Sequence, residues 1–178
     1  SMCTYPHPLA RKAYALFIDR NLGDSGLFSA VVKLEKETVR MLGTLLSNPK
    51  ASGHIVTGGT GANTLALWAA RKLSKKKNCE VIVPASAHYS FDKAGDLLGL
   101  KIVKVKLNRR FQVDTEALRK KVNSNTVAIV GIAGTTGLGV VDPISELSEI
   151  AAENGLYLHV DAAFGGFILP FLKEMGFS

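Results

Sequence analysis

The sequence predicts an α/β fold with a mostly parallel sheet and helices on both of its faces. From residue 53 onward, short apolar runs of strand length alternate with segments whose apolar residues recur at helical spacing. The run at residues 127–132 is almost continuously apolar, as expected of a strand buried on both faces. The chain has 178 residues, of which 47% are hydrophobic, so it can bury the core that this fold needs.

Residues 1–50 are predicted to form a helical N-terminal segment, and residues 51–178 part of a larger sheet domain. The first helix is expected over residues 9–20, because prolines precede it and Asn-Leu-Gly follows it. The second is expected over residues 29–47, where apolar residues recur at helical spacing as far as an Asn-Pro pair.

The sheet domain is predicted to contain five strands, over residues 54–57, 81–83, 101–106, 127–132 and 157–160. The third alternates lysine with apolar residues, which is typical of an edge strand whose charges face water. Helices are expected between successive strands, and this alternation favours parallel pairing.

The helix after the first predicted strand is expected to have one apolar face, made of Ala62, Leu65, Ala66, Ala69 and Leu73. The next helix is predicted to end at Gly99. Asp114 is expected to cap the helix that follows it, with Val113 and Leu118 at the two positions of a hydrophobic contact across the helix start. Asp142 is expected to cap the last helix, because proline suits the first helical position after it.

Charge and cysteine content narrow the function classes. The chain carries 22 Lys and Arg against 15 Asp and Glu, but these bases are spread out, so nucleic-acid binding is not expected. No apolar run approaches the roughly 20 residues that cross a bilayer, and residues 1–4 do not begin a signal peptide. Cys3 and Cys79 are too few for a disulfide framework or a metal site. A cytoplasmic protein without a membrane partner is expected.

A glycine-rich segment at residues 57–63 is the first candidate site. Glycines between a strand and a helix let the backbone approach a ligand, and the N–H groups at the helix N-terminus suit a phosphate. Thr60 adds a hydroxyl group. A tight turn without a ligand would explain the same glycines equally well. The pattern is neither a Rossmann fingerprint nor a Walker A loop.

Three further candidates also follow predicted strands. Asp161 ends the last strand, and beside a pyridine nitrogen its carboxylate would keep that nitrogen protonated, so that the ring accepts electrons. His88 suits stacking on an aromatic cofactor or acid–base work, and Thr135 suits hydrogen bonding to a ligand. Each residue also has an alternative explanation without a ligand. Asp161 could cap the next turn, His88 could be a surface histidine, and Thr135 could belong to an ordinary loop. Their convergence on one edge of the sheet predicts a single ligand site.

Together these motifs resemble the group II decarboxylases that depend on pyridoxal 5'-phosphate (PLP), and among them the archaeal L-tyrosine/L-aspartate decarboxylases. The resemblance covers essentially the whole chain and is most specific at residues 131–136 and 159–167. It also includes residues 1–8, 21–24 and 54–56. It implies an incomplete large domain of the type I, aspartate aminotransferase-like fold. Sphingosine-1-phosphate lyases are similar over the same region, with a looser match.

The resemblance implies that Gly59, Thr60 and the backbone of Gly61 hold the PLP phosphate. The family usually has Glu-Ala-Asn after this threonine, whereas this chain has Gly61, Ala62 and Asn63. Loss of the acid is expected to loosen the loop or to alter a polar contact.

The resemblance also implies the residues around the pyridine ring. His88 would stack on one face of the ring, and Ala163 would lie against the other. Asp161 would pair with the ring nitrogen, and Thr135 would form a hydrogen bond near the ring or its histidine. His88 and Asp161 are therefore the candidate catalytic residues.

The family's Schiff-base lysine follows a histidine some tens of residues beyond the Asp161 motif, and no lysine of this sequence has that context. By this analogy the chain is a fragment that binds PLP at best non-covalently and does not turn over. Two later strands of the family fold would lie between the first and last strands predicted here. Their absence would leave backbone groups unpaired, so the isolated chain is not expected to be a stable monomer.

The implied activity of the parent enzyme, a homodimer or a protein completed by a second polypeptide, is α-decarboxylation of an L-amino acid. L-Tyrosine would give tyramine, and L-aspartate would give β-alanine, as in methanofuran or coenzyme A biosynthesis. Two alternatives stay open: a carbon–carbon lyase acting on a phosphorylated sphingoid base, and a non-catalytic assembly or binding module of the same fold. Nucleotide binding at the glycine-rich loop is a weaker alternative, because it would leave His88 and Asp161 without a role.

Overall fold

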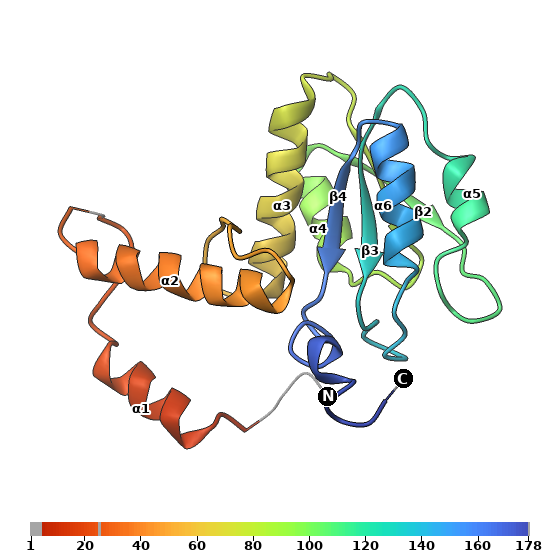
Figure 1. Cartoon of the computed structure of the whole chain (residues 1–178). Helices are drawn as coiled ribbons and strands as arrows, with labels where there is room; N and C mark the ends of the chain where they lie inside the picture. Colours follow the sequence, from red (N-terminus) through yellow and green to blue (C-terminus); the bar gives the residue numbers. More distant parts are fainter. Residues whose placement is uncertain (1–4, 25, 178) are drawn as a thin grey trace. The chain divides into compact units, whose positions relative to one another are not determined.

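The computed structural model describes residues 5–24 and 26–177 (Figure 1). The predictions made for residues 1–4 and for Cys3 fall outside this range. Two compact units make up the chain, and they divide between Ile55 and Val56. In the part of the chain that the structure describes, no helix has the length and apolar character needed to cross a membrane.

The first unit contains two helices, α1 (Pro8–Leu16) and α2 (Ser29–Leu45). Both end earlier than predicted. After α1 the chain forms a turn at residues 17–19. After α2 the N–H of Leu46 donates to the carbonyl of Gly43, which tightens the last turn instead of extending the helix.

The first predicted strand is absent, so this prediction was wrong. Residues 51–56 have no regular secondary structure. The N–H of Ile55 donates to the side chain of Glu35 on α2 at 2.9 Å, not to a neighbouring strand. A strand needs a neighbour that satisfies its backbone groups, and none of the described strands pairs with this segment.

The second unit is built on a parallel sheet of four strands, where five were predicted. The strands are β1 (Glu80–Pro84), β2 (Lys101–Val105), β3 (Thr126–Ile132) and β4 (Tyr157–Asp161), in the spatial order β2-β1-β3-β4. β2 is an edge strand, as predicted. Its exposed Lys101 and Lys104 pair with Glu80 and Asp92 at 2.7 and 2.9 Å.

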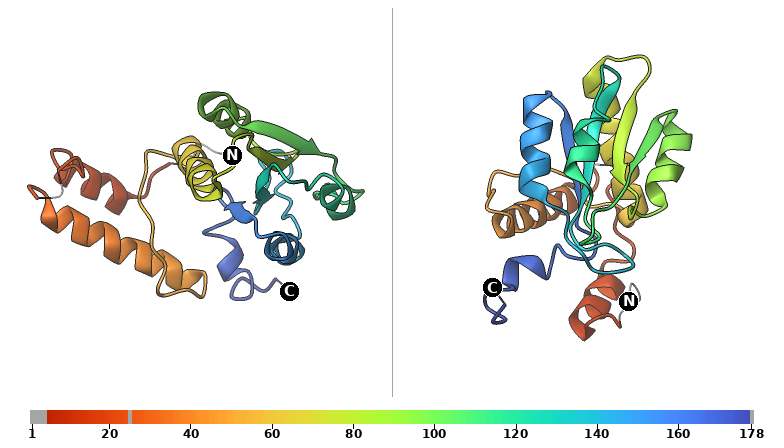
Figure 2. Two further views of the ribbon diagram at one scale, coloured as in Figure 1. Left: turned by 90° about the horizontal axis from the view of Figure 1, so that it is seen from above. Right: turned by 90° about the vertical axis from the view of Figure 1, so that its right-hand side faces the viewer.

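Helices cover both faces of this sheet, which confirms the predicted α/β class (Figure 2). The helices are α3 (Gly59–Ser74) and α4 (Ser90–Leu98) on one face, and α5 (Thr115–Arg119) and α6 (Ile144–Glu153) on the other. Successive strand residues point to opposite faces. Val81 and Val83 therefore pack in the core beneath α3 and α4, whereas Ile82 packs in the core beneath α5 and α6. A short 3₁₀ helix, η1 (Leu169–Phe171), follows β4.

The face that α3 presents to the sheet differs from the predicted apolar face. Leu65 and Leu73 are 41% and 74% exposed, whereas Asn63, Leu67 and Ala70 are buried. The prediction failed because a polar residue, Asn63, points toward the sheet. An apolar pattern alone does not mark the buried face of such a helix.

Asp114 caps α5 as predicted. Its carboxylate accepts the N–H of Ala117 at 2.9 Å, and this bond is the largest cause of the lowered pKa of Asp114. Val113 and Leu118, on the two sides of the helix start, are fully buried in the same core cluster.

Asp142 does not cap α6, which corrects the prediction for that residue. Pro143 takes the N-cap position, and no side chain caps the helix. The Asp142 carboxylate instead accepts the N–H groups of Val113 and Ile132, at 2.7 and 2.8 Å. It therefore ties the end of β3 to the segment before α5.

Candidate functional site

The glycine-rich segment forms the uncapped start of α3. Gly58, at the N-cap, has a φ of +138°, which residues with a side chain rarely adopt. The N–H of Ala62 donates to the carbonyl of Gly58 at 3.0 Å. The N–H groups of Gly59, Thr60 and Gly61 lie before this bond and have no acceptor within the helix. This end of α3 is therefore suited to an anion.

The start of α3 lies at the carboxyl edge of the sheet. Because the strands are parallel, the segments after β1, β3 and β4 all leave from this edge. The arrowheads of β3 and β4 point to the end of the sheet where α3 begins (Figure 1). Gly59 also lies next to Ala163, since a Cβ placed on Gly59 would be 3.8 Å from the Ala163 Cβ.

Asp161 is the last residue of β4 and is partly buried. Its Oδ1 accepts the N–H of Ala163 at 3.0 Å, and its Oδ2 accepts the Nδ2–H of Asn63 at 2.9 Å. A carboxylate oxygen can accept more than one hydrogen bond. The group is thus held in place and still able to accept a bond from a ligand.

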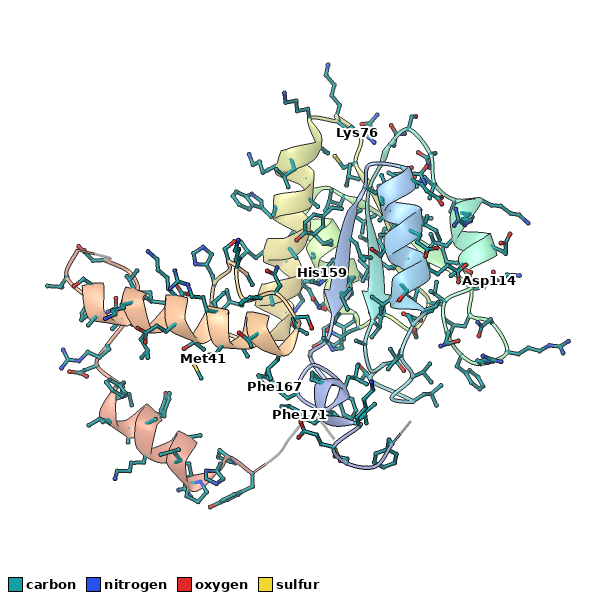
Figure 3. The ribbon with its side chains drawn as sticks, in the orientation of Figure 1. Met41, Lys76, Asp114, His159, Phe167 and Phe171 are labelled. Carbon is teal, nitrogen blue, oxygen red and sulfur yellow. The ribbon has the colours of Figure 1, made fainter. Side chains whose placement is uncertain are left out.

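Asn63 connects Asp161 to Ser90 and His159, two residues that were not predicted to belong to the site. Its Nδ2 also donates to the Ser90 hydroxyl at 3.0 Å, and its Oδ1 lies 2.8 Å from Nε2 of His159. Asn63 is 4% exposed and Ser90 is fully buried. We call Asn63, Ser90, His159 and Asp161 the Asn63 cluster, which joins α3, α4 and β4 through these bonds. Figure 3 labels one member, His159 on β4.

One part of this cluster could have been found from the sequence. His159 and Asp161 are two residues apart on a strand, so their side chains lie on the same face of the sheet. The partners Asn63 and Ser90 lie far away in the sequence, and no local pattern brings them to that face.

The donors and acceptors of the cluster fix the protonation of His159. Both Nδ2 hydrogens of Asn63 are used, by Asp161 and Ser90, so its Oδ1 must accept and His159 Nε2 must donate. Burial lowers the pKa of His159 below its ordinary value, and the Asp161 carboxylate opposes that shift. At neutral pH, His159 is therefore a neutral imidazole with its proton on Nε2.

The free energy of unfolding should consequently fall as the pH drops below about 6.5, the ordinary pKa of histidine. In that range the unfolded chain binds more protons at His159 than the folded chain, so stability rises with pH. The change His159→Gln should remove this part of the pH dependence, as measured by urea unfolding between about pH 5 and 8. The control His54→Gln removes an exposed histidine that lies 3.5 Å from Glu35, and it should keep the fall in stability that His159 causes. Equal pH profiles for the wild type and H159Q would contradict the assignment.

His88 lies in the turn between β1 and α4, as predicted for a residue at the carboxyl edge. Its Nδ1 accepts the N–H of Ser90 at 3.2 Å, and its ring centroid is 4.1 Å from that of Tyr89. Because Ser90 also bonds to Asn63, the turn that carries His88 is connected to Asp161 through the Asn63 cluster.

Thr135 lies in the loop after β3 but does not join that cluster. Its hydroxyl accepts the N–H of Val140 at 3.1 Å, so the side chain stabilises its own loop. Among the described residues, no hydrogen bond links Thr135 to His88 or Asp161. The loop is nevertheless held beside β4, because the N–H of Ala133 donates to the carbonyl of Asp161 at 2.8 Å.

Gly61 occupies the third position of α3, where the structure has room for a side chain. A Cβ there would lie 3.5 Å from the Thr57 hydroxyl oxygen, which is an ordinary contact. We expect Gly61→Glu to stabilise the fold by about 1 kcal/mol through helix propensity, and by about 0.3–1 kcal/mol more through the acid at the helix N-terminus. Urea unfolding measures the gain, and Gly61→Gln should show only the first contribution. Destabilisation by both variants would contradict this reading.

Comparison with known families gives a match to the pyridoxal-dependent decarboxylase conserved domain over residues 15–177. A probable L-tyrosine/L-aspartate decarboxylase of Methanothermobacter thermautotrophicus is 54% identical, over 99% of this chain and 48% of that protein. An L-aspartate decarboxylase of Thermococcus kodakarensis is 55% identical, over the whole chain and 46% of that protein. The chain spans about half the length of the curated relatives it matches.

Solved structures share the fold. A sphingosine-1-phosphate lyase of Burkholderia pseudomallei has a TM-score of 0.87 and 32% identity, over 95% of this chain and 42% of that one. A glutamate decarboxylase of Lactobacillus brevis has a TM-score of 0.85 and 23% identity, over 98% and 44% of the two chains. The second likeness shows the fold alone. Both agree with the predicted α/β architecture.

Proposed function

Because the chain belongs to the pyridoxal-dependent decarboxylase family, we propose that it forms the cofactor-binding part of an enzyme that decarboxylates L-tyrosine or L-aspartate. This membership confirms the family resemblance and, with it, PLP as the family's cofactor. The observation that carries the proposal is the position of Asp161, a fixed carboxylate at the end of a parallel strand, at the same sheet edge as the uncapped start of α3.

The residues at this edge fit PLP. The N–H groups of Gly59, Thr60 and Gly61 suit the phosphate, and no side chain caps that helix end. The Ser86 hydroxyl, in the same turn as His88, is buried without a hydrogen-bond partner among the described residues, so it is available to bond to a ligand at this edge.

When bound, PLP supplies a ring that accepts electrons from the substrate. Asp161 would hold a proton at the ring nitrogen, and the Ala163 N–H and the Asn63 amide would keep its carboxylate in place for that purpose. Ala163 is small and exposed beside Gly59, so it leaves space for a flat ring. His88 would cover the opposite face of the ring. Thr135 would order the loop after β3, because its hydroxyl accepts the N–H of Val140.

An assay of the complete protein that contains this chain tests the proposal. With PLP present, L-tyrosine or L-aspartate labelled at the α-carboxyl carbon should release labelled CO₂, and a phosphorylated sphingoid base should not be cleaved. Cleavage of the sphingoid base would favour the lyase alternative, for which the Burkholderia structure is the supporting observation. Absence of any visible cofactor absorbance that borohydride removes would favour a non-catalytic module.

We further propose that the products, tyramine or β-alanine, enter methanofuran or coenzyme A biosynthesis.

We also propose that the complete protein is a homodimer. Large apolar side chains support association, because none of the residues of α1 is buried and Leu9, Tyr14 and Leu16 are 67–72% exposed. Trp68 on α3 is also 46% exposed. Sedimentation of the complete protein at several concentrations distinguishes a dimer from a monomer.

A further inference from the structure

We propose that Asn63 is a positioning residue that fixes the Asp161 carboxylate against the cofactor's ring nitrogen, with His159 and Ser90 acting through it. This inference rests on the proposed PLP site.

The hydrogen bonds of Asn63 allow only one orientation of its amide. Nδ2 faces two acceptors, the Asp161 carboxylate at 2.9 Å and the Ser90 hydroxyl at 3.0 Å. Oδ1 faces His159 Nε2 at 2.8 Å. A 180° rotation of the amide would place Oδ1 against a carboxylate oxygen and lose the bond from His159. The Asp161 carboxylate, which can only accept, thus determines which way Asn63 points, and Nε2 of His159 donates to the Oδ1 that this orientation presents. In return, the Asn63 amide holds Oδ2 of Asp161 in place.

Burial makes this arrangement rigid. Asn63 is 4% exposed and Ser90 is fully buried, so water cannot easily replace the bonds that the amide makes. Phe91 packs near His159 with a ring-centroid distance of 5.9 Å, and it is itself 1% exposed. The partners of Asn63 are therefore fixed from α4 as well as from β4.

The position of Asn63 on α3 links the two ends of the proposed cofactor site. It lies four residues after Gly59, about one helical turn or ~6 Å along the axis. One rigid helix therefore offers backbone N–H groups for a phosphate at its start and, one turn later, holds the carboxylate proposed for the ring nitrogen. The spacing between the two contacts is set by the helix, not by a flexible loop.

The test compares PLP with 1-deaza-PLP, in which a carbon atom replaces the ring nitrogen, on the complete protein. We expect Asn63→Ala to weaken PLP binding at least tenfold and to change deaza-PLP binding less than twofold. A purely structural role would weaken both ligands equally. Asn78→Ala, at an exposed position beyond the other end of α3, is the matched control and should leave both affinities unchanged. The effects of Asn63→Ala and Asp161→Asn should not add, because both act on the same carboxylate.

A second variant keeps the test decisive if Asn63→Ala does not fold. Asn63→Asp retains the size of the side chain and an acceptor for His159, but places a second carboxylate beside Asp161. We expect it to raise the pKa of His159, as followed by NMR of the imidazole, and to weaken PLP binding selectively over deaza-PLP.

The role of Asn63 would be overturned if the wild type and both variants bound PLP with equal affinity and Asn63→Asp left the pKa of His159 unchanged. Failure of the wild type to bind either ligand would instead overturn the proposed PLP site itself. The two failures are therefore distinguishable.

Discussion

Replacing Asp161 with Asn in the complete protein should lower the decarboxylation rate by about 10²–10³-fold, the range typical for removing one preorganised electrostatic group. Asparagine has nearly the same shape, so it preserves the packing at the end of β4. It carries no negative charge, however, and so cannot hold a proton on the ring nitrogen. Single-turnover kinetics at saturating PLP measures the chemical step without interference from weaker cofactor binding.

The control for this substitution is Asp96→Asn, on the exposed side of α4, which should leave the rate unchanged. A D161N protein that binds PLP and decarboxylates at the wild-type rate would show that the carboxylate at the end of β4 is not the partner of the ring nitrogen.

Replacing Asp142 with Ala should lower the free energy of unfolding by about 2–6 kcal/mol. The carboxylate is 2% exposed and accepts the N–H groups of Val113 and Ile132. Its removal leaves two buried donors unsatisfied, and each costs about 1–3 kcal/mol. Asn should cost less than Ala, because its carbonyl oxygen still accepts one bond while its NH₂ group faces the other donor.

Burial raises the pKa of Asp142, and the two backbone hydrogen bonds oppose that shift. Urea unfolding at constant pH measures the loss, with Asp92→Ala as the control. Asp92 forms an exposed pair with Lys104, which is worth about 0–1 kcal/mol. Equal stability losses for the two variants would show that Asp142 does not link β3 to the segment before α5.

Elements determined by local chemistry were predicted well from the sequence. The run at 127–132 became β3, which is buried on both faces, and Asp114 caps α5 because its carboxylate reaches the N–H of Ala117. Gly99 ends α4 in the left-handed conformation, with a φ of +62°. In each case the interaction that decides the structure lies within a few residues of the sequence feature that predicted it.

The errors arose where a distant partner decides the outcome. Residues 54–57 have the composition of a strand, but no described strand pairs with them. The N–H of Ile55 donates to the Glu35 carboxylate instead. Asp142 precedes a helix, yet its carboxylate bonds to Val113, far away in the sequence. The buried face of α3 includes Asn63, which points inward because its hydrogen-bond partners lie on α4 and β4.

The candidate site shows the same division. Its residues were found because each follows a strand, and parallel strands bring their carboxyl ends to one edge. That rule placed Asp161 and His88 at the edge where α3 begins. It could not identify Asn63 or Ser90, because their importance lies in bonds to Asp161 and to each other rather than in their position after a strand. The roles of the individual site residues stay predictions.

The most direct measurement is a crystal structure of the complete protein grown with PLP. We expect a phosphate within hydrogen-bond distance, about 2.7–3.2 Å, of the N–H groups at the start of α3, and a ring nitrogen at the same distance from an Asp161 oxygen. A cofactor bound elsewhere, or an Asp161 carboxylate that points away from the ring, would contradict the proposed PLP site.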